Sequence, residues 1–161
     1  MDYLWTPWRY RYIADTSKAA GCIFCDAIAA NDDVRMLVVF RGKKNYIILN
    51  RYPYTSGHVM VVPYAHVADL ASADPETLAE MMRLAQHVQA ALGVTYRPEG
   101  YNVGMNLGRA AGAGVTGHIH LHVLPRWTGD TNFMTVAGET RVEPEDLATT
   151  YEKLHKALST Q

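Results

Sequence analysis

The 161-residue sequence has little net charge, few cysteines and no long apolar run, and each absence excludes a class of protein. Its 15 Lys and Arg against 16 Asp and Glu leave a formal net charge of −1, so it lacks the basic surface that grips a nucleic-acid backbone. No window approaches about 18 uninterrupted apolar residues, which excludes an apolar membrane-spanning helix. Two cysteines cannot form the disulfide framework of a small secreted domain.

The N-terminus also lacks the pattern of a secretory signal. An acidic residue stands at Asp2 and no apolar core of signal-peptide type follows it, so the expected location is the cytoplasm. Hydrophobic residues make up 48% of the chain, enough for the core of one ordinary domain. No repeat, low-complexity tract or linker divides it. We therefore expect a single domain over residues 1–161, with residues 1–20 as an N-terminal arm and residues 21–161 as the core.

Hydrophobic periodicity predicts a mixture of strands and helices. Apolar runs of strand length occupy residues 36–40, 46–49, 58–62, 101–106, 117–124 and 132–136. A helical period covers residues 74–92, with Asp74 as N-cap, Pro75 at the first helical position and Gly93 closing the C-terminus. A second helical period covers residues 144–158. The order predicts an α+β fold with a largely antiparallel sheet, one long helix and a C-terminal helix.

In the segment GHIHLHVLPRW, residues 117–127, three histidines alternate with three aliphatic residues. Alternate side chains of a strand share one face, so we expect His118, His120 and His122 to project together at about 6.6 Å per step. Chance is a poor explanation, because a solvated strand face would mix Thr, Lys, Glu and Ser. One metal ion held by all three is disfavoured, because the first and third would lie about 13 Å apart.

The remaining interpretation is a reaction surface on which the histidines take separate roles. Neutral imidazole is a fair nucleophile near neutral pH, and its protonated form donates to anionic oxygens, a combination that suits phosphoryl chemistry. Glycines at 104, 108, 112 and 114 precede the histidines and let backbone N–H groups approach phosphate oxygens. This order predicts a phosphate-binding loop facing a nucleophile.

The two cysteines form a second candidate site. Cys22 and Cys25 have the C-x-x-C spacing of half a zinc site. The alternatives are two buried thiols or a redox pair, and the redox pair is disfavoured because no strand–CxxC–helix context surrounds it. A zinc site needs two more ligands, of which His66 in the segment PYAH is the best third.

The motif His-φ-His-φ-His-φ-φ, with φ apolar, is the signature of the histidine triad (HIT) family, and residues 118–124 match it in full. The resemblance extends over most of the chain. Further similar segments are Leu49-Asn50, residues 57–63 and Asn106-Leu107-Gly108. The outer segments, residues 4–9 and 126–133, resemble the branch that contains diadenosine tetraphosphate phosphorylases. The resemblance implies a HIT-like fold with a mainly antiparallel sheet of about five strands, and usually a homodimer.

The resemblance also implies a reaction and roles for individual residues. His120 would attack the α-phosphorus of a dinucleoside polyphosphate and form a nucleotidyl-histidine, with a backbone carbonyl holding its other ring nitrogen protonated. His122 would donate to an α-phosphate oxygen or assist the leaving group, and His118 would flank the pocket. Water or inorganic phosphate would then release the nucleotide. The substrate-binding positions implied are Leu49, Asn50, His58, Asn106, Gly112, Gly114, Val115, Arg126 and Trp127.

Zinc-bearing relatives imply a structural, four-ligand zinc site made by Cys22, Cys25, His66 and His118, in which case His118 serves the metal and not the phosphate. The chain departs from the family at residues 112–117, where the usual Gln is missing and the loop is one residue longer. That roomier loop favours phosphorolysis over hydrolysis.

Several alternatives stay open at this point. One is a hydrolase of dinucleoside polyphosphates or nucleoside phosphoramidates, another a nucleotide-binding module without turnover, and a third a metal-sensing protein. Arg126 and Trp127 also fit a surface ion pair and an interface tryptophan.

Overall fold

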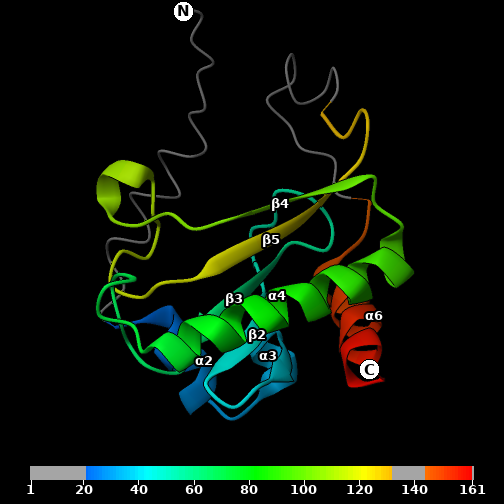
Figure 1. Ribbon diagram of the computed structural model, residues 1–161. Helices are drawn as coiled ribbons and strands as arrows, with labels where there is room; N and C mark the ends of the chain where they lie inside the picture. Colours follow the sequence, from blue (N-terminus) through cyan, green and yellow to red (C-terminus); the bar gives the residue numbers. More distant parts are fainter. Residues whose placement is uncertain (1–20, 132–143, 161) are drawn as a thin grey trace, which may run out of the picture.

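The computed structural model describes residues 21–131 and 144–160, and in these residues an antiparallel sheet carries helices on both faces (Figure 1). The strand order is β1-β2-β3-β5-β4. The elements are α2 (Ile23–Ala29), α3 (Asp33–Met36), β1 (Val38–Arg41), β2 (Asn45–Leu49), β3 (Val59–Pro63), α4 (Pro75–Tyr96), β4 (Gly100–Gly104), η1 (Arg109–Ala111), β5 (Leu121–Arg126) and α6 (Leu147–Ser159). None of the helices described is both long and apolar enough to cross a membrane.

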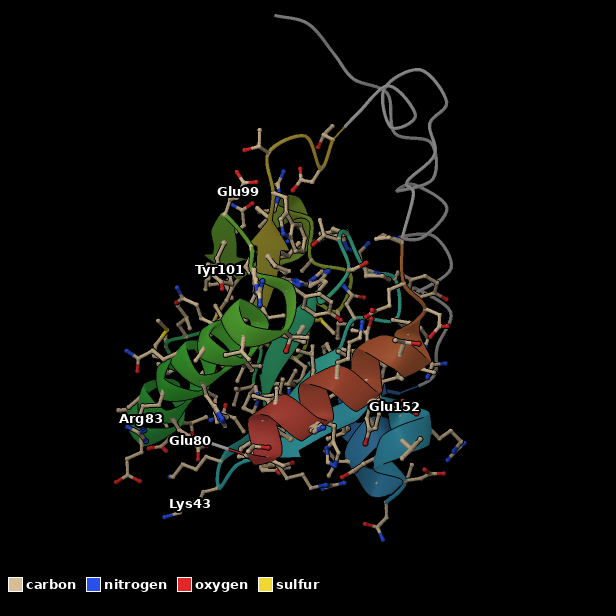
Figure 2. All side chains as sticks on the ribbon, turned by 90° about the vertical axis from the view of Figure 1, so that its right-hand side faces the viewer. Lys43, Glu80, Arg83, Glu99, Tyr101 and Glu152 are labelled. Carbon is tan, nitrogen blue, oxygen red and sulfur yellow. The ribbon has the colours of Figure 1, made fainter. Side chains whose placement is uncertain are left out.

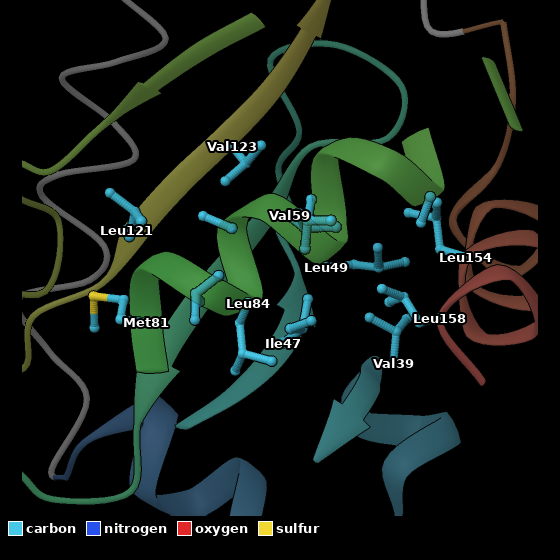
Figure 3. Close-up of a cluster of buried hydrophobic side chains, with 14 of the residues drawn as sticks. Val39, Ile47, Leu49, Val59, Met81, Leu84, Leu121, Val123, Leu154 and Leu158 are labelled. Carbon is cyan, nitrogen blue, oxygen red and sulfur yellow. The ribbon is translucent and has the colours of Figure 1, made fainter. Parts of the chain in front are cut away.

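Helices α4 and α6 cover one face of the sheet and enclose the larger core (Figures 1 and 3). Its buried residues include Val39, Ile47, Leu49, Val59, Val61, Met81, Leu84, Leu121, Val123, Leu154 and Leu158. Burying one such side chain fully is worth about 1.5–3 kcal/mol. This layer is therefore the main source of the sheet's stability and the rigid support for the opposite face.

The opposite face, which we call the histidine face, carries Tyr46, Ile48, Met60 and His122. Its smaller apolar cluster packs against Phe24 and Ala27 of α2. Met60 lies directly opposite His122 in the β3–β5 ladder, so the two side chains share this face. The Tyr46 hydroxyl donates a 2.8 Å hydrogen bond to the Phe24 carbonyl oxygen. Helix α2 is therefore fastened to the sheet beside the histidines.

Most of the expected elements are present. The strands expected over residues 36–40, 46–49, 58–62 and 101–106 lie within two residues of β1, β2, β3 and β4. The C-terminal helix begins at Leu147 rather than at residue 144, because the Asp146 side chain accepts from the Thr149 N–H and caps it. The strand expected over residues 132–136 and the arm over residues 1–20 lie outside the described residues.

Two expectations were wrong in detail, and two short helices were missed. Helix α4 continues through Gly93 to Tyr96, and the left-handed residue that ends it is Arg97, just before Pro98. Strand β5 begins at Leu121 instead of residue 117, because the Ile119 N–H donates to the Val67 carbonyl oxygen, which lies past the end of β3. Helices α2 and α3 were not expected, since neither is long enough to show a helical period.

Glu80 of α4 joins this helix to the β1–β2 turn (Figure 2). Its carboxylate accepts hydrogen bonds from the Lys43 N–H at 2.8 Å, the Lys44 N–H at 2.6 Å and the Asn45 side-chain amide at 2.8 Å. Burial opposes ionisation of Glu80, but these hydrogen bonds outweigh it and lower the pKa of the carboxyl group. The ionised carboxylate therefore fixes the hairpin that leads into the two central strands.

Glu80→Gln is expected to lower the free energy of unfolding by about 1–3 kcal/mol, because an amide cannot accept all of these hydrogen bonds. Urea unfolding at neutral pH measures the change. Glu152→Gln on the exposed side of α6 is the matched control and should shift stability by less than about 0.5 kcal/mol (Figure 2). Equal free energies of unfolding for the two variants would show that the hydrogen bonds of Glu80 to the β1–β2 turn do not stabilise the fold.

Candidate active site

Four side chains from three separate segments converge at one end of the histidine face. The group consists of Cys22, Cys25, His66 and His118, whose candidate ligand atoms all lie within 4.8 Å of one another. The His118 Nδ1 atom lies 3.3 Å from Cys22 Sγ and 3.7 Å from Cys25 Sγ, and His66 Nδ1 lies 3.4 Å from Cys25 Sγ. Ligand atoms on a tetrahedral zinc ion stand about 3.6 Å apart. These residues fit a metal ion with two sulfur and two nitrogen ligands.

The second ring nitrogen of His118 fixes the tautomer that such a site needs. Its Nε2–H donates to the Pro63 carbonyl oxygen at 2.9 Å, and a carbonyl oxygen can only accept. In the neutral imidazole the lone pair is then on Nδ1, which faces the sulfur atoms. An outer hydrogen bond of this kind is typical of metal-binding histidines.

His120 is held by the backbone of the same segment. Its Nδ1–H donates to the His118 carbonyl oxygen at 2.9 Å, which is the backbone hydrogen bond that the sequence analysis expects. The lone pair of the neutral ring therefore lies on Nε2. Only 6% of the residue is exposed. Burial lowers the pKa of His120 from its ordinary value, so the ring stays neutral and nucleophilic at neutral pH.

His58 and His122 form a second hydrogen-bonded pair. The Tyr54 N–H donates to His58 Nδ1 at 3.1 Å, so the His58 proton lies on Nε2. Nε2 in turn lies 2.9 Å from His122 Nδ1 and donates to it. The remaining proton of neutral His122 is therefore on its own Nε2. The structure thus places the unprotonated Nε2 of His120 beside the ring of His122, whose Nε2 carries the proton, with ring centroids 4.8 Å apart.

Burial and the neighbouring His120 lower the pKa of His122 to about 4. Between pH 6.5 and 4 an unfolded chain binds a proton at this histidine that the folded chain does not, so acid destabilises the fold. We expect the contribution of His122 to the free energy of unfolding to fall by up to about 1.4 kcal/mol for each unit by which the pH is lowered across that window. Urea unfolding of wild type and His122→Gln from pH 7 to 4 measures it. Parallel curves for the two proteins would contradict this assignment.

The glycine loop is compact and positioned directly before the histidines. Gly108 and Gly112 have φ of 82° and 84°, a conformation that glycine adopts without strain. The Asn106 side-chain amide donates to the Gly112 carbonyl oxygen at 3.5 Å, so Asn106 supports the loop from inside. Gly114 and Val115 are half-buried, and Val115 packs against the smaller apolar cluster of the histidine face.

Arg126 and Trp127, the substrate contacts predicted at the end of β5, form hydrogen bonds within the protein. Arg126 donates to Asp130 at 2.5 and 2.8 Å and to the Asn102 side-chain oxygen at 2.6 Å. The Trp127 N–H donates to the same Asp130 carboxylate at 3.2 Å. The arginine lowers the pKa of Asp130 to about 2 and keeps it ionised. These contacts match the ion-pair alternative for Arg126.

The other predicted contacts lie at the β2–β3 connection. Leu49 is 2% exposed in the helix-side core, and with His58 and the first turn of α6 it lines a cavity of about 190 Å³. The Asn50 amide donates to His58 Nδ1 at 3.3 Å, and its oxygen accepts the Tyr52 N–H at 2.9 Å. Asn50 therefore supports His58 directly.

Two residues at the site carry no sequence signal of their own. The ring of Phe24 lies 4.9 Å from that of His120, and the ring of Tyr54 lies 4.8 Å from that of His58. Aromatic residues that flank a cysteine pair or a turn are common in cores, so pattern alone could not assign them here.

The HIT domain model matches residues 32–129. The chain is 42% identical to the AP-4-A phosphorylase of Mycobacterium tuberculosis over 157 residues, which cover 93% of this chain and 80% of that protein. It is 31% identical over 105 residues to an adenosine 5'-monophosphoramidase of Schizosaccharomyces pombe, covering 65% and 74% of the two chains. A zinc-bound histidine triad family protein from Mycobacterium smegmatis superimposes with a TM-score of 0.72 at 32% identity, covering 87% and 94%.

Proposed function

The chain belongs to the HIT domain family, and from this premise we propose that it is a nucleotidyl transferase that splits dinucleoside polyphosphates by phosphorolysis. The substrate class is that of the AP-4-A phosphorylase to which the chain is 42% identical. The single observation that carries the proposal is the proton arrangement of the paired histidines. His120 has its lone pair on Nε2, and His122 has its proton on Nε2.

In the first step, His120 Nε2 attacks the α-phosphorus of the bound dinucleotide. A phosphorus–nitrogen bond forms as the bond from phosphorus to the bridging oxygen breaks, which releases the remaining nucleotide. The His122 N–H stabilises the negative charge that develops on the α-phosphate or on the leaving oxygen. With diadenosine tetraphosphate the leaving group is ATP, and an adenylyl group stays on His120.

In the second step, inorganic phosphate attacks the same phosphorus and displaces His120. The phosphorus–nitrogen bond breaks and the product is ADP. Gly112 and Gly114 would supply the backbone N–H groups for the phosphate oxygens, with Val115 closing the loop behind them. His58 acts through His122, and Asn50 would reach the ribose from its place beside His58. Leu49 would contribute the apolar wall of the base pocket.

We propose that the ion held by Cys22, Cys25, His66 and His118 is zinc, on the basis of the donor set and of the zinc-bound relative. A closed four-ligand zinc site is structural: it joins distant segments and leaves no position for a water molecule. The His118 side chain would then bind the metal, while the His118 carbonyl oxygen accepts the hydrogen bond from His120 Nδ1–H.

Incubation with diadenosine tetraphosphate, with and without inorganic phosphate, tests the proposal. The expected products are ATP and ADP, formed only when phosphate is present. ATP and AMP in both conditions would make the protein a hydrolase, the reaction type that the similarity to a phosphoramidase favours. Nucleotide binding without any product would make it a binding module.

We further propose a homodimer that forms through β4. This strand is at one edge of the sheet, its last three residues are exposed, and Val103 presents an apolar side chain that is 51% exposed. An exposed edge of this kind is usually paired or protected. Light scattering after size exclusion should give twice the chain mass. A cytoplasmic location belongs to the same proposal, because nucleotides and inorganic phosphate are abundant metabolites of that compartment.

A further inference from the structure

Phe24 connects the four-residue metal group to the proposed nucleophile. It lies between Cys22 and Cys25 in the first turn of α2 and is 2% exposed. Its ring centroid lies 5.5 Å from that of His118, at 71°, and 4.9 Å from that of His120, at 46°. One aromatic ring therefore contacts both a candidate metal ligand and the proposed nucleophile.

The main chain of Phe24 is fixed from two directions. The Tyr46 hydroxyl donates to its carbonyl oxygen at 2.8 Å, and Tyr46 is itself fully buried in β2. On the other side, a metal ion bound by both flanking cysteines would hold the turn against His118. Both anchors act on the main chain around Phe24 and together would set where its ring lies.

His120 needs such a contact, because its own hydrogen bond fixes only one edge of the ring. The Nδ1–H bond to the His118 carbonyl oxygen leaves the imidazole free to swing about that edge. The ring of His122 limits the swing on one side, with centroids 4.8 Å apart and an interplanar angle of 75°. Phe24 lies against the same imidazole, so the two neighbouring rings together restrict its motion.

We propose that Phe24 is a positioning residue that holds the His120 ring in the orientation from which Nε2 attacks phosphorus, and that the metal group acts on the reaction through it. The inference rests on the proposed function, because it concerns the formation of the nucleotidyl-histidine. It gives the metal a role in the chemistry although the ion would touch neither substrate nor nucleophile. A misplacement of reacting atoms by about 1 Å can slow a reaction on the order of 100-fold.

The first test compares Phe24→Leu, which keeps apolar volume but loses the planar ring, with Phe24→Tyr, which keeps the ring. Rapid quench measures single-turnover formation of the nucleotidyl-histidine, and calorimetry measures the Kd for AMP. Phe24→Leu is expected to slow formation by roughly 10- to 100-fold with Kd unchanged. Phe24→Tyr should recover most of the rate. Wild-type rates in Phe24→Leu would overturn the inference.

Val38→Ala is the matched control for loss of packing. Val38 is 1% exposed in the same apolar cluster and lies on β1, the edge strand that is separated from β5 by β2 and β3. It should lower the unfolding midpoint while leaving the single-turnover rate within about twofold. If Val38→Ala slows the reaction as much as Phe24→Leu, the effect is general loosening and the inference is wrong. If wild type forms no nucleotidyl-histidine, the proposed function itself fails, and the same assay shows it.

The second test removes the metal from wild type and from Phe24→Leu, with zinc content measured by atomic emission. If the metal acts through Phe24, chelation slows the wild type but adds little to the defect of the variant, and the two effects are not additive. Zinc content should match between the two proteins before chelation. Equal further slowing of both proteins would show that the metal does not act through Phe24.

Discussion

His120→Ala is expected to lower turnover of diadenosine tetraphosphate by at least about 10⁴-fold while changing the Kd for AMP by less than about threefold. The variant loses the atom that forms the covalent bond, and a neighbouring imidazole cannot replace it. His122 has its proton on the Nε2 atom, and its Nδ1 atom accepts from His58 at 2.9 Å. The rate is measured by separating nucleotides after timed incubation, and the affinity by calorimetry.

His87→Ala is the matched control for deletion of an imidazole. His87 lies on α4, its ring packs edge-on against Phe40, and its buried Nε2 atom has no hydrogen-bond partner among the residues that the structure describes. That deletion should leave turnover within about twofold. Turnover in His120→Ala above about one hundredth of the wild-type rate would require a different nucleophile.

Cys25→Ser is expected to remove the bound metal and to lower the unfolding midpoint by roughly 10 °C. Structural zinc sites contribute folding free energy outright, and a loss of about 3 kcal/mol shifts the midpoint by that amount in a domain of this size. The four candidate ligands come from the start of α2, the loop after β3 and the segment before β5, so a bound ion would join parts of the chain far apart in sequence. Thermal melts and metal analysis of the same samples measure both effects.

A chelator provides the internal check on this prediction. It should lower the midpoint of wild type to that of Cys25→Ser and leave the variant unchanged, because only the wild type has metal to lose. Asp26→Asn, an exposed change beside the metal group, should keep one zinc per chain and the wild-type midpoint. An unchanged midpoint in Cys25→Ser would contradict a structural metal site.

The sheet was predictable because its strands are short apolar runs separated by turn residues. Residues 46–49 and 59–62 alternate between two apolar clusters, one on each face, so both sides of each strand are apolar. The helix ends were less predictable. Gly93 is a usual helix terminator, yet Tyr96, three residues later, still packs against the helix-side core, and this burial outweighs the preference of glycine.

At the site, the spacing of residues in the sequence predicted which side chains lie close together but not the chemical role of each one. The C-x-x-C pair and His66 lacked a fourth candidate ligand in their own segments, and the fold places His118, in the segment before β5, beside them. The shared face of His120 and His122 follows from alternation. The positions of their ring protons do not follow from alternation. They depend on the His118 carbonyl oxygen, which accepts from His120, and on the Tyr54 N–H, which sets the proton of His58 and through it that of His122.

Phe24 shows the limit of reasoning from pattern most clearly. Its sequence context, Cys-Ile-Phe-Cys, places it beside a metal half-site, and nothing in that context indicates contact with a histidine 96 residues away. The contact arises because α2 lies on the histidine face, where the Tyr46 hydroxyl donates to the Phe24 carbonyl oxygen. Packing of this kind depends on the whole fold.

The most direct test of the account is to locate the covalent intermediate. Wild-type protein mixed with diadenosine tetraphosphate without phosphate is quenched in alkali, where phosphorus–nitrogen bonds survive, and digested with trypsin. The account predicts one adenylyl group on the peptide of residues 110–126, with fragmentation placing it on His120, and its loss as ADP when phosphate is added. An adduct on His122, or turnover without any adduct, would contradict the account.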